Sequence, residues 1–310
     1  MQLRMKKGVK PLPFAKGEVG RGLQQENIMS DSQLRLSFEF FPPRTAEGKE
    51  KLIKVRDELN FFNPDFFSVT YGAGGSTRDN TKGLVNKFRE DGISAAPHLS
   101  FGGDNEETVK ALIQEYKDAG VDRIVALRGD IPSGIGGGFQ LVYANELVAF
   151  IRKHFGDHFQ LEVAAYPEIH PQAKSYSDDI RYLKGKFDAG ANSAITQYFF
   201  NPDAYFYFVD QCRKEGITQP IYPGIMPIIN YKNLIRFSDA CGAEVPRWLR
   251  KALENYGDDE ASLKAFGIEL VTELCEVMLE NEAPGLHFYT MNQTEPTAQI
   301  VKNLGLIPAE

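Results

Sequence analysis

The sequence predicts an α/β protein, a (βα)8 TIM barrel with an extra helix before the last strand. Short β-prone apolar runs alternate with longer segments of helical spacing, and there are eight such runs. An open doubly wound sheet is the alternative. That fold normally has a glycine-rich phosphate-binding turn after its first strand, and Pro42 and Pro43 stand there instead.

The eight apolar runs are the expected strands of the barrel, and they are Leu34–Phe40, Phe66–Thr70, Ser94–Leu99, Arg123–Leu127, Gln160–Tyr166, Ser193–Gln197, Ile221–Ile225 and Gly285–Tyr289. Helical segments separate them. One runs from Asn105 to Ala119, with acids early and Lys117 late, which suits the helix dipole. Gly92, Gly120 and Gly190 follow such segments, where a left-handed glycine closes a helix. Residues 241–282 exceed one crossover, which predicts the extra helix.

Residues 34–310 are expected to form a single catalytic barrel domain, since a chain of this size and composition can bury one large core. Residues 1–33 are rich in Lys and Arg and lack the apolar stretch of a secretory signal. We interpret them as a flexible N-terminal extension, with Met29 as a more natural start. A mitochondrial transit peptide is the alternative interpretation.

Charge and cysteine content narrow the function. A net charge of −7 and a pI near 5.4 argue against nucleic acid or a membrane as the partner and favour a small molecule. No apolar run approaches the ~20 residues that cross a bilayer. Cys212, Cys241 and Cys275 have neither zinc-site spacing nor the even number of a disulfide framework, so no metal is expected and a reducing cytoplasm fits.

Polar residues stand where the strands end, which is where barrel enzymes place their active sites. Alternation along the first strand points Arg35, Ser37 and Glu39 away from its apolar face, so Glu39 should reach the barrel mouth. A poorly solvated carboxyl there should have a raised pKa and suit proton donation. A structural ion pair with Arg35 or another barrel cation is the other interpretation.

The ends of the next five strands are also polar or aromatic, namely Ser68–Arg78, Pro97–His98, Ala126–Asp130, Tyr166–His170 and Thr196–Phe200. Their convergence on one mouth is harder to explain structurally than any one of them alone. No metal or Walker motif appears, and "GIGGG" at 134–138 lacks dinucleotide-fingerprint spacing, so it is expected to be a mobile loop.

Eight motifs in order, from Leu36 to Leu304, resemble methylenetetrahydrofolate reductase, and they are "FEFFPPR", "SVTYGAGGSTRD", "APHL", "VALRGD", "YPEIHPQAKS", "ITQYFF", "PGIMPI" and "LHFYTMNQ". The resemblance implies a (βα)8 barrel that binds FAD at the strand ends. It also implies ping-pong reduction of 5,10-methylenetetrahydrofolate to 5-methyltetrahydrofolate by NADH or NADPH, feeding methionine synthesis. The chain ends where the barrel should, so the bacterial form without S-adenosylmethionine control is expected.

The resemblance also assigns site residues. Glu39 matches the acid that protonates the folate and opens its five-membered ring to a 5-iminium cation, which takes hydride from flavin N5. Asp130 matches a second catalytic carboxylate, which lowers the flavin potential and stabilises that cation. The substrate-binding matches are Glu39, Thr70, Asp130, Gln197, Tyr231 and Gln293. The FAD-binding matches are Thr70, Tyr71, Ala73, His98, Arg128, Gly129, Asp130, Tyr143, Ala144, Tyr166, His170, Ala173, Asp179 and Lys186, of which Arg128, His170 and Lys186 suit the diphosphate or ribityl chain.

Three positions depart from the family pattern. Gln293 stands where the family often has Arg, which removes a cation for the folate's glutamate tail. Gly185 stands where some relatives have Arg. Tyr231 replaces a common Phe that packs on the substrate, so stacking is kept and a hydroxyl is added.

Two other functions stay open at this point. One is a flavin barrel that reduces a different imine, which the Gln293 change permits. The other is a non-catalytic folate-binding barrel, which the presence of Glu39, Asp130 and Gln197 disfavours.

A cytoplasmic homo-oligomer is expected. Tyr205–Phe208 suits a subunit interface or a buried helix, and the preference between NADH and NADPH is not predicted, since no Rossmann motif is present.

Overall fold

A parallel barrel forms the centre of the protein. The structure, a computed structural model, describes residues 34–71, 75–101, 104–128 and 143–308. Its strands are β1 (Arg35–Phe40), β2 (Phe66–Val69), β3 (Ala95–Leu99), β4 (Arg123–Ala126), β5 (Gln160–Ala165), β6 (Ser193–Thr196), β7 (Ile221–Tyr222), β8 (Gly224–Ile225) and β9 (Gly285–Tyr289). They are parallel and lie in the order β7-β6-β5-β4-β3-β2-β1-β9-β8.

The predicted strand Ile221–Ile225 is divided at Pro223, and this division closes the barrel. β7 pairs with β6, whereas β8 pairs with β9 on the other side. A Cβ on Gly224 would lie 2.1 Å from the carbonyl oxygen of Thr196 and 2.7 Å from the Tyr289 ring, so only glycine permits this close approach. The two short strands therefore act as one seventh strand, and the predicted eight-stranded barrel is confirmed.

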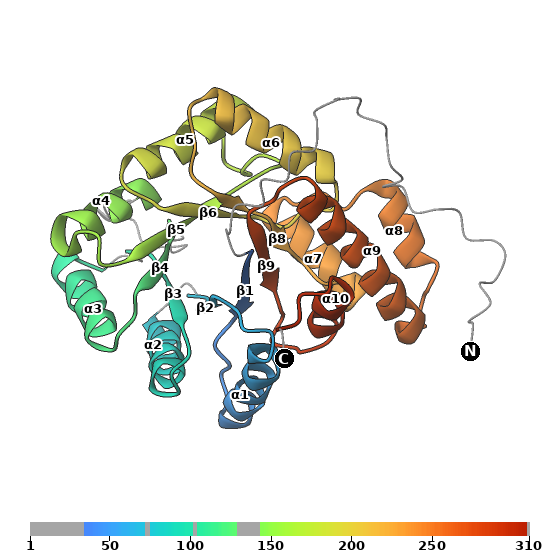
Figure 1. Cartoon of the computed structure of the whole chain (residues 1–310), viewed down its shortest axis with the longest axis horizontal. Helices are drawn as coiled ribbons and strands as arrows, with labels where there is room; N and C mark the ends of the chain where they lie inside the picture. Colours follow the sequence, from blue (N-terminus) through green and yellow to red (C-terminus); the bar gives the residue numbers. More distant parts are fainter. Residues whose placement is uncertain (1–33, 72–74, 102–103, 129–142, 309–310) are drawn as a thin grey trace.

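Helices surround the strands in Figure 1, as the alternating pattern predicts. They are α1 (Ala46–Asn60), α2 (Gly75–Glu90), α3 (Glu106–Asp118), α4 (Ala144–Phe155), α5 (Tyr176–Asp188), α6 (Pro202–Lys214), α7 (Tyr231–Cys241), α8 (Arg247–Glu254), α9 (Glu260–Glu280) and α10 (Thr297–Asn303). Three helices, α7 to α9, lie between β8 and β9, so the predicted insertion before the last strand is present. Asn105 caps α3, and Gly92, Gly120 and Gly190 have the expected positive φ.

Two apolar cores follow from the alternation of the strands. Outward residues such as Phe38 and Phe40 pack against Phe67 and the helices. A small separate cluster fills the barrel interior, and it consists of Phe66, Ala96, Val125 and Ile195.

In the predicted interface stretch, Tyr205 and Phe208 are buried in α6, while Tyr207 is 57% exposed. No helix among the described residues is long and apolar enough to cross a membrane.

The floor of the barrel holds a buried ion cluster. Glu162 of β5 is fully buried and pairs with Arg35 at 2.9 Å and with Arg123. The Arg35 guanidinium also lies 3.7 Å from the centre of the Tyr222 ring. Burial alone would raise the pKa of Glu162, but the two arginines outweigh it and hold that pKa below its usual value. Arg35 therefore pairs with Glu162, and the alternative pairing of Arg35 with Glu39 is excluded.

Replacing Glu162 with Gln should reduce the free energy of unfolding by about 3–5 kcal/mol, because the buried Arg35 and the partly buried Arg123 would lose their shared counter-charge. The pKa of Glu162 is lowered in the folded state, so this stabilisation is present above the unfolded carboxyl pKa. It should be lost as the pH falls through the lower folded value. Urea denaturation at several pH values measures both effects.

The matched control is Asp188→Asn, which breaks an exposed ion pair with Lys184 on α5. Its cost should stay within about 1 kcal/mol. Equal costs for the two variants would contradict the structural role of the floor cluster.

Candidate active site

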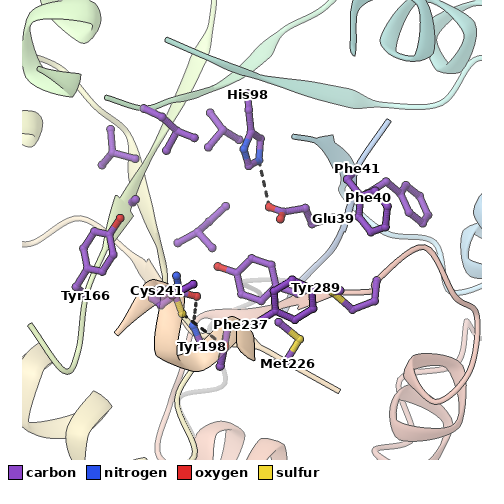
Figure 2. A pocket seen from close by; sticks show the side chains of 18 residues that line it. Glu39, Phe40, Phe41, His98, Tyr166, Tyr198, Met226, Phe237, Cys241 and Tyr289 are labelled. Atoms are coloured by element: carbon purple, nitrogen blue, oxygen red, sulfur yellow. Dashed lines mark hydrogen bonds and ion pairs between the residues drawn. The ribbon is translucent and has the colours of Figure 1, made fainter. Parts of the chain in front are cut away.

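A cavity of about 420 Å³ opens at the carboxyl ends of the barrel strands. Its walls come from β1, β3, β4, β5, β6 and β9 and from α7. In Figure 2, Tyr166 lies on one side of the cavity and Phe41 on the other. Most of the lining is apolar, and it includes Val125, Leu127, Val163, Ala164 and Ile195. A cavity of this size and character suits a small organic ligand with a flat ring.

Glu39 contributes a carboxylate to this cavity, as the alternation of β1 predicts. Figure 2 shows it directed at His98 of β3. The Oε2 atom lies 3.1 Å from His98 Nε2 and 3.5 Å from His287 Nε2, and it accepts a hydrogen bond from Ser68 Oγ at 3.4 Å. Three strands besides β1 therefore hold this side chain in one position.

His287 is the most buried of these partners. Its side chain is fully enclosed, and its Nδ1 lies 2.8 Å from Ser37 Oγ. Burial lowers the pKa of His287, so the ring is neutral at neutral pH. If the Ser37 hydroxyl donates to Nδ1, the Nε2–H of that ring faces Glu39, which defines a neutral donor beside the carboxylate.

The prediction of a raised Glu39 pKa is wrong. Burial does raise it, but the charge of His98 and the hydrogen bonds from His287 and His98 outweigh burial and lower the pKa to about 2. The physical reason is the direction of the side chains. Phe38 and Phe40 pack outward, so the groups that surround the carboxyl are imidazoles rather than phenyl rings.

Other predicted residues also reach the mouth. Tyr166 and Gln197 line the same cavity as Glu39 and His98. Thr70 and Tyr71 follow the end of β2 and are half-buried, and the Thr70 carbonyl accepts a hydrogen bond from Thr81 at 2.8 Å. The motifs "APHL", "YPEIHP" and "ITQYFF" therefore meet around one space, as the sequence predicts.

A second group of predicted residues forms a cationic cluster beside β5 and α5. Lys186 Nζ donates to the Ala164 carbonyl at 2.8 Å, and burial lowers its pKa to about 8, with Arg128 adding to the decrease. Asp179 accepts the backbone N–H of His170 at 2.8 Å. Burial, and after it the charges of Arg128 and Lys186, lower the pKa of His170. Lys186 and His170 thus lie beside the Asp179 carboxylate, and Arg128 is close enough to lower the pKa of both.

Some of the remaining residues predicted to bind FAD lie at or near the starts of helices, and the others lie outside the described residues. Tyr143 caps the N-terminus of α4 and is 52% exposed, Ala144 begins that helix, and Ala173 lies in the turn that precedes α5. Ala73, Gly129 and Asp130 lie outside the described residues, as does the "GIGGG" segment.

The departures from the family pattern do not line the cavity. The Tyr231 hydroxyl donates to Glu254 of α8 at 3.0 Å, so the added group ties α7 to α8. Gln293 is exposed in the turn after β9. A Cβ on Gly185 would meet no atom within 4 Å, so a larger side chain has room at that position of α5.

Sequence reasoning missed His287 as a partner of Glu39. The signal was available, because alternation along β9 places His287 and Tyr289 on the inward face. It also missed the wall that α7 supplies, where Phe237, Ala240 and Cys241 line the cavity. Helical spacing alone does not show which helix residues reach a barrel mouth.

Comparisons with known proteins agree with this geometry. Residues 24–305 match the sequence model of the family described as methylenetetrahydrofolate reductase. A relative named 5,10-methylenetetrahydrofolate reductase in Pectobacterium carotovorum is 39% identical, covering 92% of this chain and 95% of the relative. The Escherichia coli protein of the same name is 38% identical, over 92% and 96%.

Two further comparisons extend beyond bacterial reductases. A rice protein named probable methylenetetrahydrofolate reductase (NADH) is 40% identical over 91% of this chain, which spans about half the length of that relative. A solved Clostridium thermocellum structure, described as binding two copies of 5-methyl-5,6,7,8-tetrahydrofolic acid, shares the fold, with a TM-score of 0.63 and 19% identity. The structural match covers 89% of this chain and 94% of the Clostridium thermocellum chain. The family match and the bacterial relatives show that this chain belongs to the methylenetetrahydrofolate reductase family.

Proposed function

We propose that the protein reduces 5,10-methylenetetrahydrofolate to 5-methyltetrahydrofolate with NAD(P)H, by a ping-pong route through bound FAD, and so feeds methionine synthesis. One observation carries the proposal: Glu39 and its imidazole partners lie on a largely apolar cavity at the strand ends of a barrel whose sequence matches this family. The rice relative is named for NADH, so NADH is the first reductant to test. The proposal includes a cytoplasmic homo-oligomer, as the sequence predicts.

The described residues fit FAD. The cationic cluster of Arg128, His170 and Lys186 has one carboxylate, Asp179, and a diphosphate would supply the missing negative charge. The neighbouring cavity at the strand ends has a largely apolar lining that suits a flat ring system, with Tyr166 on one side. When bound, FAD supplies the hydride acceptor and donor that couple the two substrates.

Glu39 and His98 together provide the proton in this proposal. The low pKa of Glu39 means that the carboxyl is ionised at neutral pH, so it must gain a proton before it can act as an acid. Ligands that cover the cavity exclude water, which strengthens the burial effect and raises the Glu39 pKa toward that of a useful acid.

The acid step then opens the folate ring. Glu39 donates its proton to the folate amine, a C–N bond of the five-membered ring breaks, and the 5-iminium cation forms. The carboxylate left behind is stabilised by His98, His287 and Ser68, which already surround it.

Replacing Glu39 with Gln should slow reoxidation of the flavin by methylenetetrahydrofolate by about 10²- to 10⁴-fold, the usual contribution of a positioned acid. Reduction of the flavin by NADH should be largely unchanged, since that half-reaction needs no acid. Stopped-flow absorbance of each half-reaction measures the two rates.

Glu168→Gln is the matched control for this substitution. Burial raises the pKa of Glu168 to about 7, so Gln resembles its protonated form, and Glu168 does not line the 420 Å³ cavity. Both half-reactions should survive in that variant. An equal loss of both half-reactions in Glu39→Gln would contradict the acid role.

Replacing Lys186 with Met should weaken FAD binding by about 10- to 100-fold, since a hydrogen bond to a charged group contributes roughly 1.5–3 kcal/mol. In the unsubstituted protein, FAD affinity should also fall as the pH rises through about 8, because Lys186 loses its proton there. Fluorescence titration of the apoprotein with FAD measures both effects.

Lys184→Met removes an exposed lysine from the same helix, α5, where Lys184 pairs with Asp188. This control should bind FAD like the unsubstituted protein. Similar losses in the two variants would show that charge near α5 in general, rather than the buried ammonium, governs binding.

A further inference from the structure

The turn after β9 has an unusual backbone. Met291 and Asn292 are consecutive and both left-handed, with φ of 54° and 56°. Non-glycine residues seldom adopt this region, although Asn tolerates it best. Such strain persists only where surrounding contacts hold the chain, and it gathers at functional sites. Side-chain hydrogen bonds hold this turn.

The Asn292 side chain binds both backbone groups of Phe41. Its Oδ1 accepts the Phe41 N–H at 3.0 Å, and its Nδ2 donates to the Phe41 carbonyl at 2.8 Å. The neighbouring Thr290 Oγ1 donates to the Glu39 carbonyl at 2.7 Å and accepts the Asn292 N–H at 3.2 Å. Four hydrogen bonds thus connect this turn to the end of β1 or brace it internally.

The Asn292 side chain forms hydrogen bonds to Phe41, just beyond the last backbone pair between β1 and β9. The pairing of β1 with β9 ends at Glu39 and Tyr289. Pro42 and Pro43 follow Phe41, and neither has an N–H to donate. An amide side chain has the same donor and acceptor as a peptide group. Asn292 therefore replaces the missing pair at the position where β1 leaves the sheet.

The clamped residues face the proposed chemistry. Glu39 and Phe41 both line the cavity, and Phe41 is 44% exposed at its rim. Met291 lines the cavity from the turn itself. The cationic cluster comes from α5 and from the segments that follow β4 and β5, which are other strands of the barrel. A change in the turn should therefore disturb the acid side of the cavity and leave the cofactor side intact.

We infer that Asn292 is a positioning residue, whose amide holds Glu39 and Phe41 in register with a folate bound in the cavity. The inference rests on the proposed function. It assigns Asn292 no contact with the reacting atoms, because its two hydrogen bonds are already made to the Phe41 backbone.

The experiment uses the FAD-loaded full-length chain and three substitutions. Asn292→Ala should slow the folate half-reaction at saturating folate by about 10- to 100-fold, the scale of a 1 Å misplacement, with unchanged flavin reduction by NADH. Asn292→Gly keeps the left-handed conformation without the amide and should be as slow as Ala. Asn292→Asp keeps the acceptor for the Phe41 N–H, and its rate relative to the unsubstituted protein should rise at low pH, where a protonated carboxyl can again donate.

Asn63→Ala is the matched control. Asn63 also has a left-handed backbone, with φ of 51°, but it lies between α1 and β2 at the opposite end of the barrel. This variant should lose a similar amount of thermal stability and keep both half-reactions. Comparing it with Asn292→Ala separates general destabilisation from misplacement of the acid.

Three results would overturn the inference. The Ala and Gly variants could reduce folate as fast as the unsubstituted protein, or Gly alone could restore the rate, which would assign the effect to backbone strain. Equal losses in both half-reactions would indicate general damage. A fourth result is distinct: if NADH reduces the flavin of the unsubstituted protein but methylenetetrahydrofolate does not reoxidise it, the proposed function fails and the role of Asn292 falls with it.

Discussion

The ion pairs that β1 makes inside the barrel are the constraint on which the fold and the site depend. Alternation sends Arg35 to the floor and Glu39 to the mouth, and each meets partners from other strands. A charge in such a place is tolerated only when it is paired. The pairs therefore fix which strands lie across the barrel from one another.

The two carboxylates differ in the chemistry of their partners. Glu162 is held by arginines, which do not lose their protons in proteins, so its charge is permanent near neutral pH. Glu39 is held by imidazoles, and the His287 ring is neutral at neutral pH because burial lowers its pKa. The same burial thus yields a structural carboxylate at the floor and a chemically responsive one at the mouth.

Local sequence pattern was sufficient to predict the architecture. Apolar runs and turn glycines gave all eight strands to within a residue at each end, and strand ends identified Glu39, His98, Tyr166 and Gln197 as neighbours. The division of the seventh strand was missed because it depends on Thr196 and Tyr289 packing against Gly224. That contact joins three strands that are distant in the sequence.

The properties of the acid were harder to predict than its position. The direction of the Glu39 pKa depends on His98 and His287, which come from β3 and β9, and no local pattern shows that they converge. The role inferred for Asn292 was also not predicted from the sequence. In this turn the sequence analysis considered only Gln293, which stands where the family often has Arg. Side-chain partners across a barrel require the register, and the register requires the closed sheet.

The departures from the family pattern lie apart from this acid. The Tyr231 hydroxyl donates a hydrogen bond to Glu254, and Gln293 is exposed, so neither residue alters the groups around Glu39. Asn292, next to Gln293, keeps its hydrogen bonds to Phe41. A change of the exposed Gln293 side chain therefore leaves in place the Asn292 and Thr290 hydrogen bonds that connect the turn after β9 to the end of β1.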